Sequence, residues 1–289
     1  MRLLSSLFAA FLLLQGCANA PLRGTGDLGV VIERASGSVQ VVDTTQRSSL
    51  GKIEGLGDLS HASLNFSRDA RYAYVYGRDG GLTQIDLLLQ KIVKRSVQAG
   101  NSIGGAISQD GRLVAVANYE PGGVKVFDAA SLELVADIPA VGENGKASKV
   151  IGLVDAPGNR FVWSLFEAGE IWVGDFRTPR KPELRKYRHV GKEPYDAMIT
   201  ADGRYYLAGL FGEDGLAMLD LWNPDAGVAR VLDGYGRGEQ KLPVYKMPHL
   251  EGWAATGNEL LVPAVGRHEV LVVDQGSWKE AGRIPVHGQ

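Results

Sequence analysis

The chain has 289 residues, of which 45% are hydrophobic and 22% charged, and its formal net charge is −2. This composition excludes an intrinsically disordered protein, because the chain carries enough apolar residues to bury a core. The charge balance shows no basic excess of the kind that nucleic-acid-binding domains have, so we expect no nucleic-acid partner. The single cysteine excludes an internal disulfide and a multi-thiolate metal site.

The N-terminus predicts an export signal. Met1 and Arg2 are followed by an apolar run, residues 3–14, that is too short to span a bilayer. The run ends in Leu14-Gln15-Gly16-Cys17, which resembles the lipobox of bacterial lipoproteins. We therefore expect residues 1–20 to be a lipoprotein signal peptide with a short tether, and Cys17 to be acylated and held at a membrane in the periplasm. The alternative is an ordinary signal peptide cleaved near residues 18–20.

Residues 21–289 are built from a repeat. Each unit has a short apolar strand, a polar turn, a strand rich in β-formers, a glycine-bearing loop, a third strand ending in Asp and a more polar fourth strand. Five full units cover residues 61–97, 103–140, 149–190, 194–235 and 249–286, and a shorter unit covers 28–53. Four strands in roughly 40–50 residues are typical of a β-propeller blade. We predict an all-β fold, a β-propeller domain of four-stranded antiparallel blades.

The closure of this ring is a separate question. A propeller must pair its first and last blades or leave sheet edges exposed. The first unit lacks its inner strand, and the chain stops at residues 285–289, where earlier repeats begin the next inner strand. We therefore expect a sequence truncated at its C-terminus, with about six blades present. A complete six-bladed ring is the alternative.

Strand order predicts which side chains share a face. The start of each first strand and the loop between the second and third strands lie on one face, the front, and the Asp-Gly turns lie on the back. The front therefore collects His61, Lys149, Tyr195 and His249 from strand starts, and Arg78, residues 118–120, 166–167, 211–213 and 267–268 from loops. Histidines, cations, aromatics and carboxylates around one opening suit a flat, anionic, metal-bearing ligand better than a peptide or a sugar.

Each of these residues also has a purely structural interpretation. His61 can hydrogen-bond the junction between blades, Arg78 can be an ordinary turn residue, and Glu167 can be a plain loop carboxylate. The basic run over residues 177–188 is typical of a solvated strand edge that discourages pairing, with contact to an anionic lipid or partner as the alternative.

The repeats read Ser108-Gln109-Asp110-Gly111-Arg112 and then Val126-Phe127-Asp128, and Leu59-Ser60-His61 begins a blade. With the lipobox and the stretch Lys246–Trp253, they resemble the NirF family of heme d1 biosynthesis proteins of denitrifying bacteria. That family is related to the d1-binding propeller of cytochrome cd1 nitrite reductase. Its propellers have eight blades, so the resemblance implies that the last two are missing here.

The resemblance implies binding of heme d1 or dihydro-heme d1 on the front face, with His61 as the axial ligand to the metal. Further cofactor-binding residues are then Arg78, Asn118, Lys149, Trp253 and Arg267. Dehydrogenation of a propionate would need proton transfer, for which His249, Glu167 and Tyr195 are the candidates. Other heme d1 maturation proteins and nitrite reductase would be partners, and a homodimer is compatible with the sequence. The alternative function is a non-catalytic scaffold or chaperone that binds protein partners in the periplasm.

Overall fold

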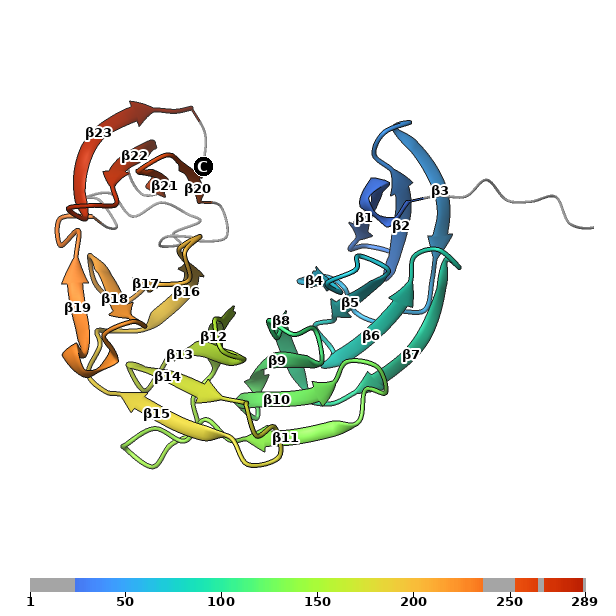
Figure 1. Ribbon diagram of the computed structural model, residues 1–289, viewed down its shortest axis with the longest axis horizontal. Helices are drawn as coiled ribbons and strands as arrows, with labels where there is room; N and C mark the ends of the chain where they lie inside the picture. Colours follow the sequence, from blue (N-terminus) through green and yellow to red (C-terminus); the bar gives the residue numbers. More distant parts are fainter. Residues whose placement is uncertain (1–23, 236–252, 265–267, 288–289) are drawn as a thin grey trace, which may run out of the picture.

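The computed structural model describes residues 24–235, 253–264 and 268–287, in which β-strands form six antiparallel sheets (Figure 1). The first sheet has three strands and each of the other five has four. The sheets follow one another around an arc, and the first strand of each four-stranded sheet lies innermost (Figure 1). The predicted all-β propeller architecture, with four-stranded antiparallel blades, is confirmed.

The strand boundaries follow the repeat. In chain order the strands are β1 (Leu28–Glu33), β2 (Ser38–Asp43), β3 (Ser48–Ile53), β4 (Ser63–Phe66), β5 (Tyr72–Tyr76), β6 (Gly81–Asp86), β7 (Lys91–Val97), β8 (Asn101–Ile107), β9 (Leu113–Glu120), β10 (Gly123–Asp128), β11 (Leu134–Ile138), β12 (Val150–Ala156), β13 (Arg160–Leu165), β14 (Glu170–Asp175), β15 (Glu183–Tyr187), β16 (Pro194–Ile199), β17 (Tyr205–Leu210), β18 (Leu216–Asp220), β19 (Val228–Val231), β20 (Ala254–Thr256), β21 (Glu259–Ala264), β22 (Glu269–Asp274) and β23 (Lys279–Pro285). Two 3-10 turns, η1 (Thr25–Asp27) and η2 (Pro224–Ala226), complete the described elements.

The repeated aspartates hold the turns. The hydroxyls of Ser67, Ser108 and Thr200 each donate a 2.6 Å hydrogen bond to the aspartate two residues later, in the turn between the first and second strands. The aspartate that ends each third strand accepts a backbone N–H from the following turn, as Asp128 does from Ser131 at 2.8 Å. Short acceptor side chains stabilise such turns because they replace a backbone acceptor. These repeated residues therefore stabilise the turns that join the strands of each blade.

The hydrophobic core lies between successive sheets. Trp163 and Trp172, for example, are at most 1% exposed and fill the space between the third and fourth sheets, with ring centroids 6.3 Å apart. Strand β6 is buried along its whole length, because a middle strand of a blade has neighbouring sheets on both faces. Many of the small residues lie in the inner strands, and many of the polar residues lie in the loops at the two ends of the blades.

No helix among the described residues is long and apolar enough to cross a membrane. In the first sheet β1 pairs with β2 and with no other described strand. The predicted signal peptide and Cys17 lie outside the described residues.

Candidate functional site

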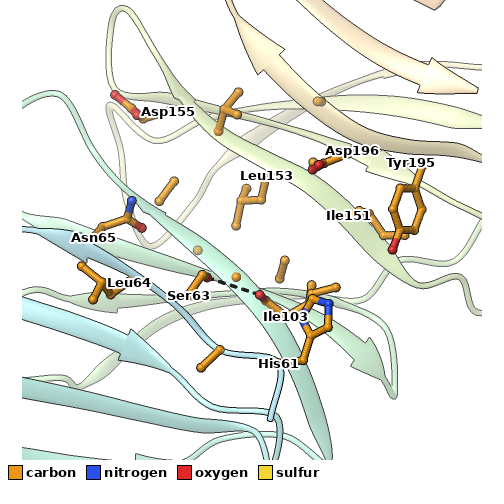
Figure 2. A pocket seen from close by; sticks show the side chains of 18 of the residues that line it. His61, Ser63, Leu64, Asn65, Ile103, Ile151, Leu153, Asp155, Tyr195 and Asp196 are labelled. Atoms are coloured by element: carbon orange, nitrogen blue, oxygen red, sulfur yellow. Dashed lines mark hydrogen bonds between the residues drawn. The ribbon is translucent and has the colours of Figure 1, made fainter. Parts of the chain in front are cut away.

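A cavity of about 410 Å³ lies between the inner strands β4, β8, β12 and β16 of four consecutive sheets (Figure 2). Much of its wall is made of small residues, because the inner strands approach one another closely. A Cβ atom on Gly105 of β8 would lie 2.3 Å from Cε1 of Tyr76, so only glycine fits there. The small wall residues are Ala62, Gly104, Gly105, Ala106, Gly152 and Ala197.

The two ends of the cavity differ in chemistry. His61, just before β4, and Tyr195, in β16, lie toward one end, and Asn65 and Asp155 lie toward the other (Figure 2). The first pair comes from where the inner strands begin, and the second pair from where they end. The structure therefore brings His61 and Tyr195 to one opening from two different sheets, on the face that strand order predicts to be the front.

Two arginines lie at the front of the blades. Arg34, in the turn after β1, lines the cavity and is exposed. Arg78, in the loop between β5 and β6, donates its backbone N–H to the carbonyl of Asp58 at 2.7 Å. Within the described part of the chain, neither guanidinium forms a hydrogen bond or an ion pair. Each therefore keeps its planar set of donors for an anion, which suits a carboxylate.

An aromatic cluster lies at the same face of the blades. The ring centroid of Phe166 is 5.9 Å from that of Tyr195 and 5.9 Å from that of Phe211, and the last two are 5.4 Å apart. Tyr119 extends the cluster, because its hydroxyl is hydrogen-bonded to Tyr195. Burial, with help from this hydrogen bond, raises the pKa of Tyr119, so the phenol stays protonated near neutral pH.

Lys149 differs from the two arginines, because it already has a partner. Its Nζ lies 2.5 Å from Oε1 of Glu167 and 5.4 Å from the ring centroid of Phe166. Glu167 also accepts hydrogen bonds from the Lys149 backbone at 2.7 Å and from Ser148 at 3.0 Å. Lys149 thus lies at the front, as predicted, but its charge is used within the loop.

The contacts of Glu167 also decide its protonation. Partial burial would raise the pKa of this carboxyl, but the hydrogen bonds from Lys149 and Ser148 outweigh burial and hold the pKa below its usual value of 4.5. An ionised carboxylate with several donors is a weak base and no acid at neutral pH. We therefore do not retain Glu167 as a candidate for proton transfer.

Asn118 lies away from the opening. It is 1% exposed, and its amide exchanges two hydrogen bonds, of 2.9 and 3.2 Å, with the amide of Gln98. A ligand at the front cannot reach a side chain so enclosed, so its role is to join two blades. Trp253 is half-buried and packs against the cores on both sides of the fifth sheet. His249 and Arg267 lie outside the described residues.

The candidate site contains residues that sequence reasoning did not select. Arg34 occupies the same kind of loop as Arg78, so the rule that selected one would have selected the other had it been applied to the short first unit. Tyr119, Phe166 and Phe211 lie in loops predicted to be at the front, but nothing in the sequence shows that their rings meet. No group of three or more potential metal-ligating side chains occurs among the described residues.

Comparisons with known proteins give one consistent result. Residues 23–289 match the Cytochrome D1 heme domain family. The chain is 66% identical over 280 residues to Protein NirF of Pseudomonas aeruginosa, covering 96% of this chain and 71% of that protein. It is 61% identical over 285 residues to Protein NirF of Stutzerimonas stutzeri, covering 98% of this chain and 73% of that protein.

A solved structure is also similar. It is described as dihydro-heme d1 dehydrogenase NirN in complex with DHE, and it superposes with a TM-score of 0.77 at 27% sequence identity. The match covers 94% of this chain and 56% of that one, so the chain spans little more than half of NirN.

Proposed function

Because the chain belongs to the Cytochrome D1 heme domain family, we propose that it binds heme d1 or dihydro-heme d1 at the front of the propeller and acts in heme d1 biosynthesis. The finer step that we propose is late, either the final modification of the tetrapyrrole or its handover to nitrite reductase in denitrification. The observation that carries this proposal is that His61 and Arg34 line the cavity and Arg78 lies in the front loop between β5 and β6, and that neither guanidinium forms a hydrogen bond or an ion pair with a described residue.

The residues at the front fit such a ligand. A d1-type heme is a flat ring that carries an iron and several carboxylates. His61 is half-exposed at the cavity opening, where its imidazole would be able to bind the iron of such a ligand. Arg34 and Arg78 would hold carboxylates through paired donors. The rings of Phe166, Tyr195 and Phe211 form an apolar surface against which a flat macrocycle can pack.

The chemistry of a late step can be divided between ligand and protein. Conversion of a propionate side chain to an acrylate removes two electrons and two protons, so an electron acceptor is needed. When bound, the heme supplies a conjugated redox-active system, and an external oxidant or partner redox protein would take the electrons. Both protons must pass to groups at the opening or to water. Tyr195 remains the described candidate from the sequence, because it lines the cavity and its hydroxyl is hydrogen-bonded to Tyr119.

We also propose that the protein works in the periplasm as a lipoprotein attached through Cys17, on the basis of the sequence Leu14-Gln15-Gly16-Cys17. The apolar run before it supports export. Other heme d1 maturation proteins would then be accessible partners in the same compartment.

An absorption titration of the full chain with heme d1 and dihydro-heme d1 tests heme binding. We expect wild type to change the ligand spectrum, and His61→Ala to bind about 100-fold more weakly, equal to about 2.7 kcal/mol. His189→Ala is the matched control, because His189 is 86% exposed, pairs with Glu143 and does not line the cavity. A folded wild-type chain that leaves the spectrum unchanged would contradict heme binding and favour the scaffold function.

A further inference from the structure

Buried leucines hold the segment that leads to His61 in place. Between β3 and β4, Leu56 and Leu59 are at most 1% exposed, whereas Asp58 and Ser60 are exposed. The two leucines fasten the segment to the core between the first and second sheets. His61 follows Leu59 by two residues, so its direction depends on the conformation of the turn at residues 58–61.

Asp58 organises that turn from within. Its Oδ1 atom accepts a 2.8 Å hydrogen bond from the backbone N–H of Ser60. A carboxylate bound to the N–H two residues later forms a compact turn that restricts the backbone before the next residue. The hydrogen bonds from the Ser60 side chain and backbone lower the pKa of Asp58, so the carboxylate is ionised and a strong acceptor near neutral pH.

The same aspartate also contacts the loop that carries Arg78. The carbonyl of Asp58 accepts the backbone N–H of Arg78 at 2.7 Å, and its own N–H points to Oδ2 of Asp79 at 3.4 Å. Asp79 is in turn fixed by Arg95, whose Nη2 lies 2.5 Å from Oδ2. The guanidinium of Arg78 also attracts the Asp58 carboxylate. The segment before β4 and the loop after β5 are therefore joined through one residue.

We propose that Asp58 is a positioning residue that sets the imidazole of His61 and the guanidinium of Arg78 at a fixed relative place for one ligand. This inference rests on the proposed heme-binding function. An imidazole that binds the metal and a guanidinium that binds a carboxylate can hold the same rigid ligand tightly only if the distance between them is fixed before binding. If it is not fixed, ordering the two loops costs part of the binding free energy. Asp58 touches neither iron nor carboxylate and acts through Ser60 and Arg78.

Three variants separate the geometry of the turn from its charge. Asp58→Ala removes both the turn acceptor and the charge, Asp58→Asn keeps an acceptor oxygen and removes the charge, and Ser60→Ala removes only the hydroxyl. Asp202→Ala is the matched control. Asp202 accepts the N–H of Arg204 at 3.0 Å in a turn of the same kind, at the back of the fifth sheet.

The readouts are the electron paramagnetic resonance spectrum of bound ferric heme d1, its dissociation constant, and the melting temperature of each full-length variant. For Asp58→Ala we expect about tenfold weaker binding, as for loss of a supporting residue around a metal ligand, and a broadened low-spin signal. Asp58→Asn should retain the sharp signal and bind about threefold more weakly. Asp202→Ala should lower the melting temperature comparably and leave the signal and the dissociation constant unchanged.

The two proposals fail in different ways. If wild type binds heme and Asp58→Ala has the wild-type signal and dissociation constant, the positioning role is wrong and heme binding stands. If wild type binds no heme, heme binding is wrong. The role of the turn is then tested by NMR on the ligand-free chain labelled with ¹³C-histidine. The resonance that is missing from the spectrum of His61→Ala is assigned to His61. That resonance should broaden in Asp58→Ala and not in Asp202→Ala, and an unchanged resonance would overturn the positioning role as well.

Discussion

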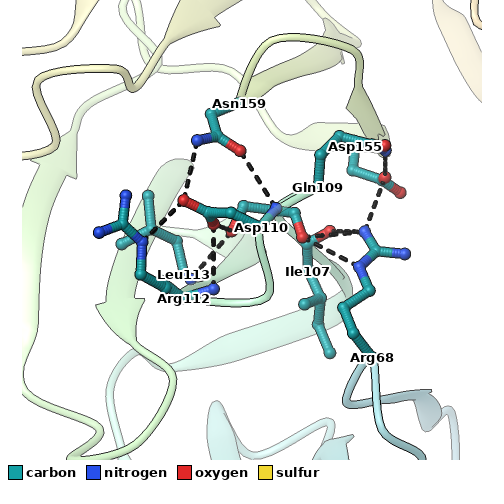
Figure 3. Close-up of polar contacts among 9 residues, drawn as sticks. Arg68, Ile107, Gln109, Asp110, Arg112, Leu113, Asp155 and Asn159 are labelled. Carbon is teal, nitrogen blue, oxygen red and sulfur yellow. Dashed lines mark hydrogen bonds and ion pairs between the residues drawn. The ribbon is translucent and has the colours of Figure 1, made fainter.

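At the back of the blades Arg68 donates hydrogen bonds to the carbonyls of Ile107 and Ser108 (Figure 3). At the front, by contrast, the guanidiniums of Arg34 and Arg78 form no hydrogen bond or ion pair with a described residue. Arg68 also pairs with Asp155 at 3.0 Å, so one guanidinium connects three consecutive sheets. Both ends of the blades carry cations, but Arg34 and Arg78 at the front differ from Arg68 in forming no hydrogen bond or ion pair through their guanidiniums with a described residue.

The difference indicates how this propeller separates stability from binding. At the back, the turn in which a Ser or Thr hydroxyl donates to the Asp two residues later recurs in the second, third and fifth sheets, and its polar groups hydrogen-bond one another within and between sheets. At the front, the cations Arg34 and Arg78 contribute little to the fold, because an arginine at a half-open surface adds little stability unless it is paired. Charge left without a partner beside an open cavity is better explained by a ligand than by folding.

The largest effect should come from removing the unpaired charge. We expect Arg34→Gln with Arg78→Gln to weaken binding of heme d1 by about 100-fold, since two charge-assisted contacts are lost, and to leave the melting temperature within about 2 °C. A titration followed by thermal unfolding measures both quantities. Lys149→Gln is the control, because Lys149 is already paired with Glu167, and its effect on affinity should be less than about threefold. If Lys149→Gln weakened heme d1 binding as much as the double arginine variant does, the distinction between paired and unpaired cations would be wrong.

The reverse result is expected at the back. Arg68→Met should lower the free energy of unfolding by about 2 kcal/mol, because it removes hydrogen bonds to two backbone carbonyls and the partner of Asp155 while keeping the apolar stem. Urea unfolding measures this change. The dissociation constant for heme d1 should stay within about twofold, and a larger loss of affinity would show that the two ends are coupled.

The contrast between the ends also bears on what a sequence can predict. The turns were predictable because the same acidic residue recurs at fixed positions, so the ends of β6, β10, β14, β18 and β22 could be placed at an aspartate. Such a repeat is a local rule, in which each Asp bonds the N–H of a residue two or three positions away. Strand order then assigned His61, Tyr195 and Lys149 to one face.

The pairing of those front residues was not predictable. Lys149 and Arg78 look alike in sequence, and only the position of Glu167 on the neighbouring strand end neutralises the first. Asn118 lies one residue before Tyr119, and the alternation of a strand sends Asn118 into the blade interface and Tyr119 to the cluster. Which residues face one another across the axis depends on blade spacing, a property of the assembled sheets.

The smallest expected effect is a dependence of stability on pH that arises at the back turns. Asp110 accepts hydrogen bonds from the hydroxyl of Ser108 at 2.6 Å, from the side chain of Arg112 at 2.8 Å and from the amide of Asn159 at 2.9 Å (Figure 3). Burial alone would raise the pKa of Asp110, but the hydrogen bonds from Ser108 and from the backbone and side chain of Arg112 outweigh burial and lower the pKa from 3.8 to about 2.

Because the folded-state pKa lies below the unfolded one, the contribution of Asp110 is complete above about pH 4 and is lost as the pH falls toward 2. Free energies of unfolding from urea titrations between pH 2.5 and 6 should therefore decline less steeply on the acid side in Asp110→Asn than in wild type. The variant keeps an acceptor for Ser108 but no longer titrates. Parallel curves for the two proteins would mean that Asp110 is protonated equally in the folded and unfolded chains, and that the back-turn network does not depend on its charge.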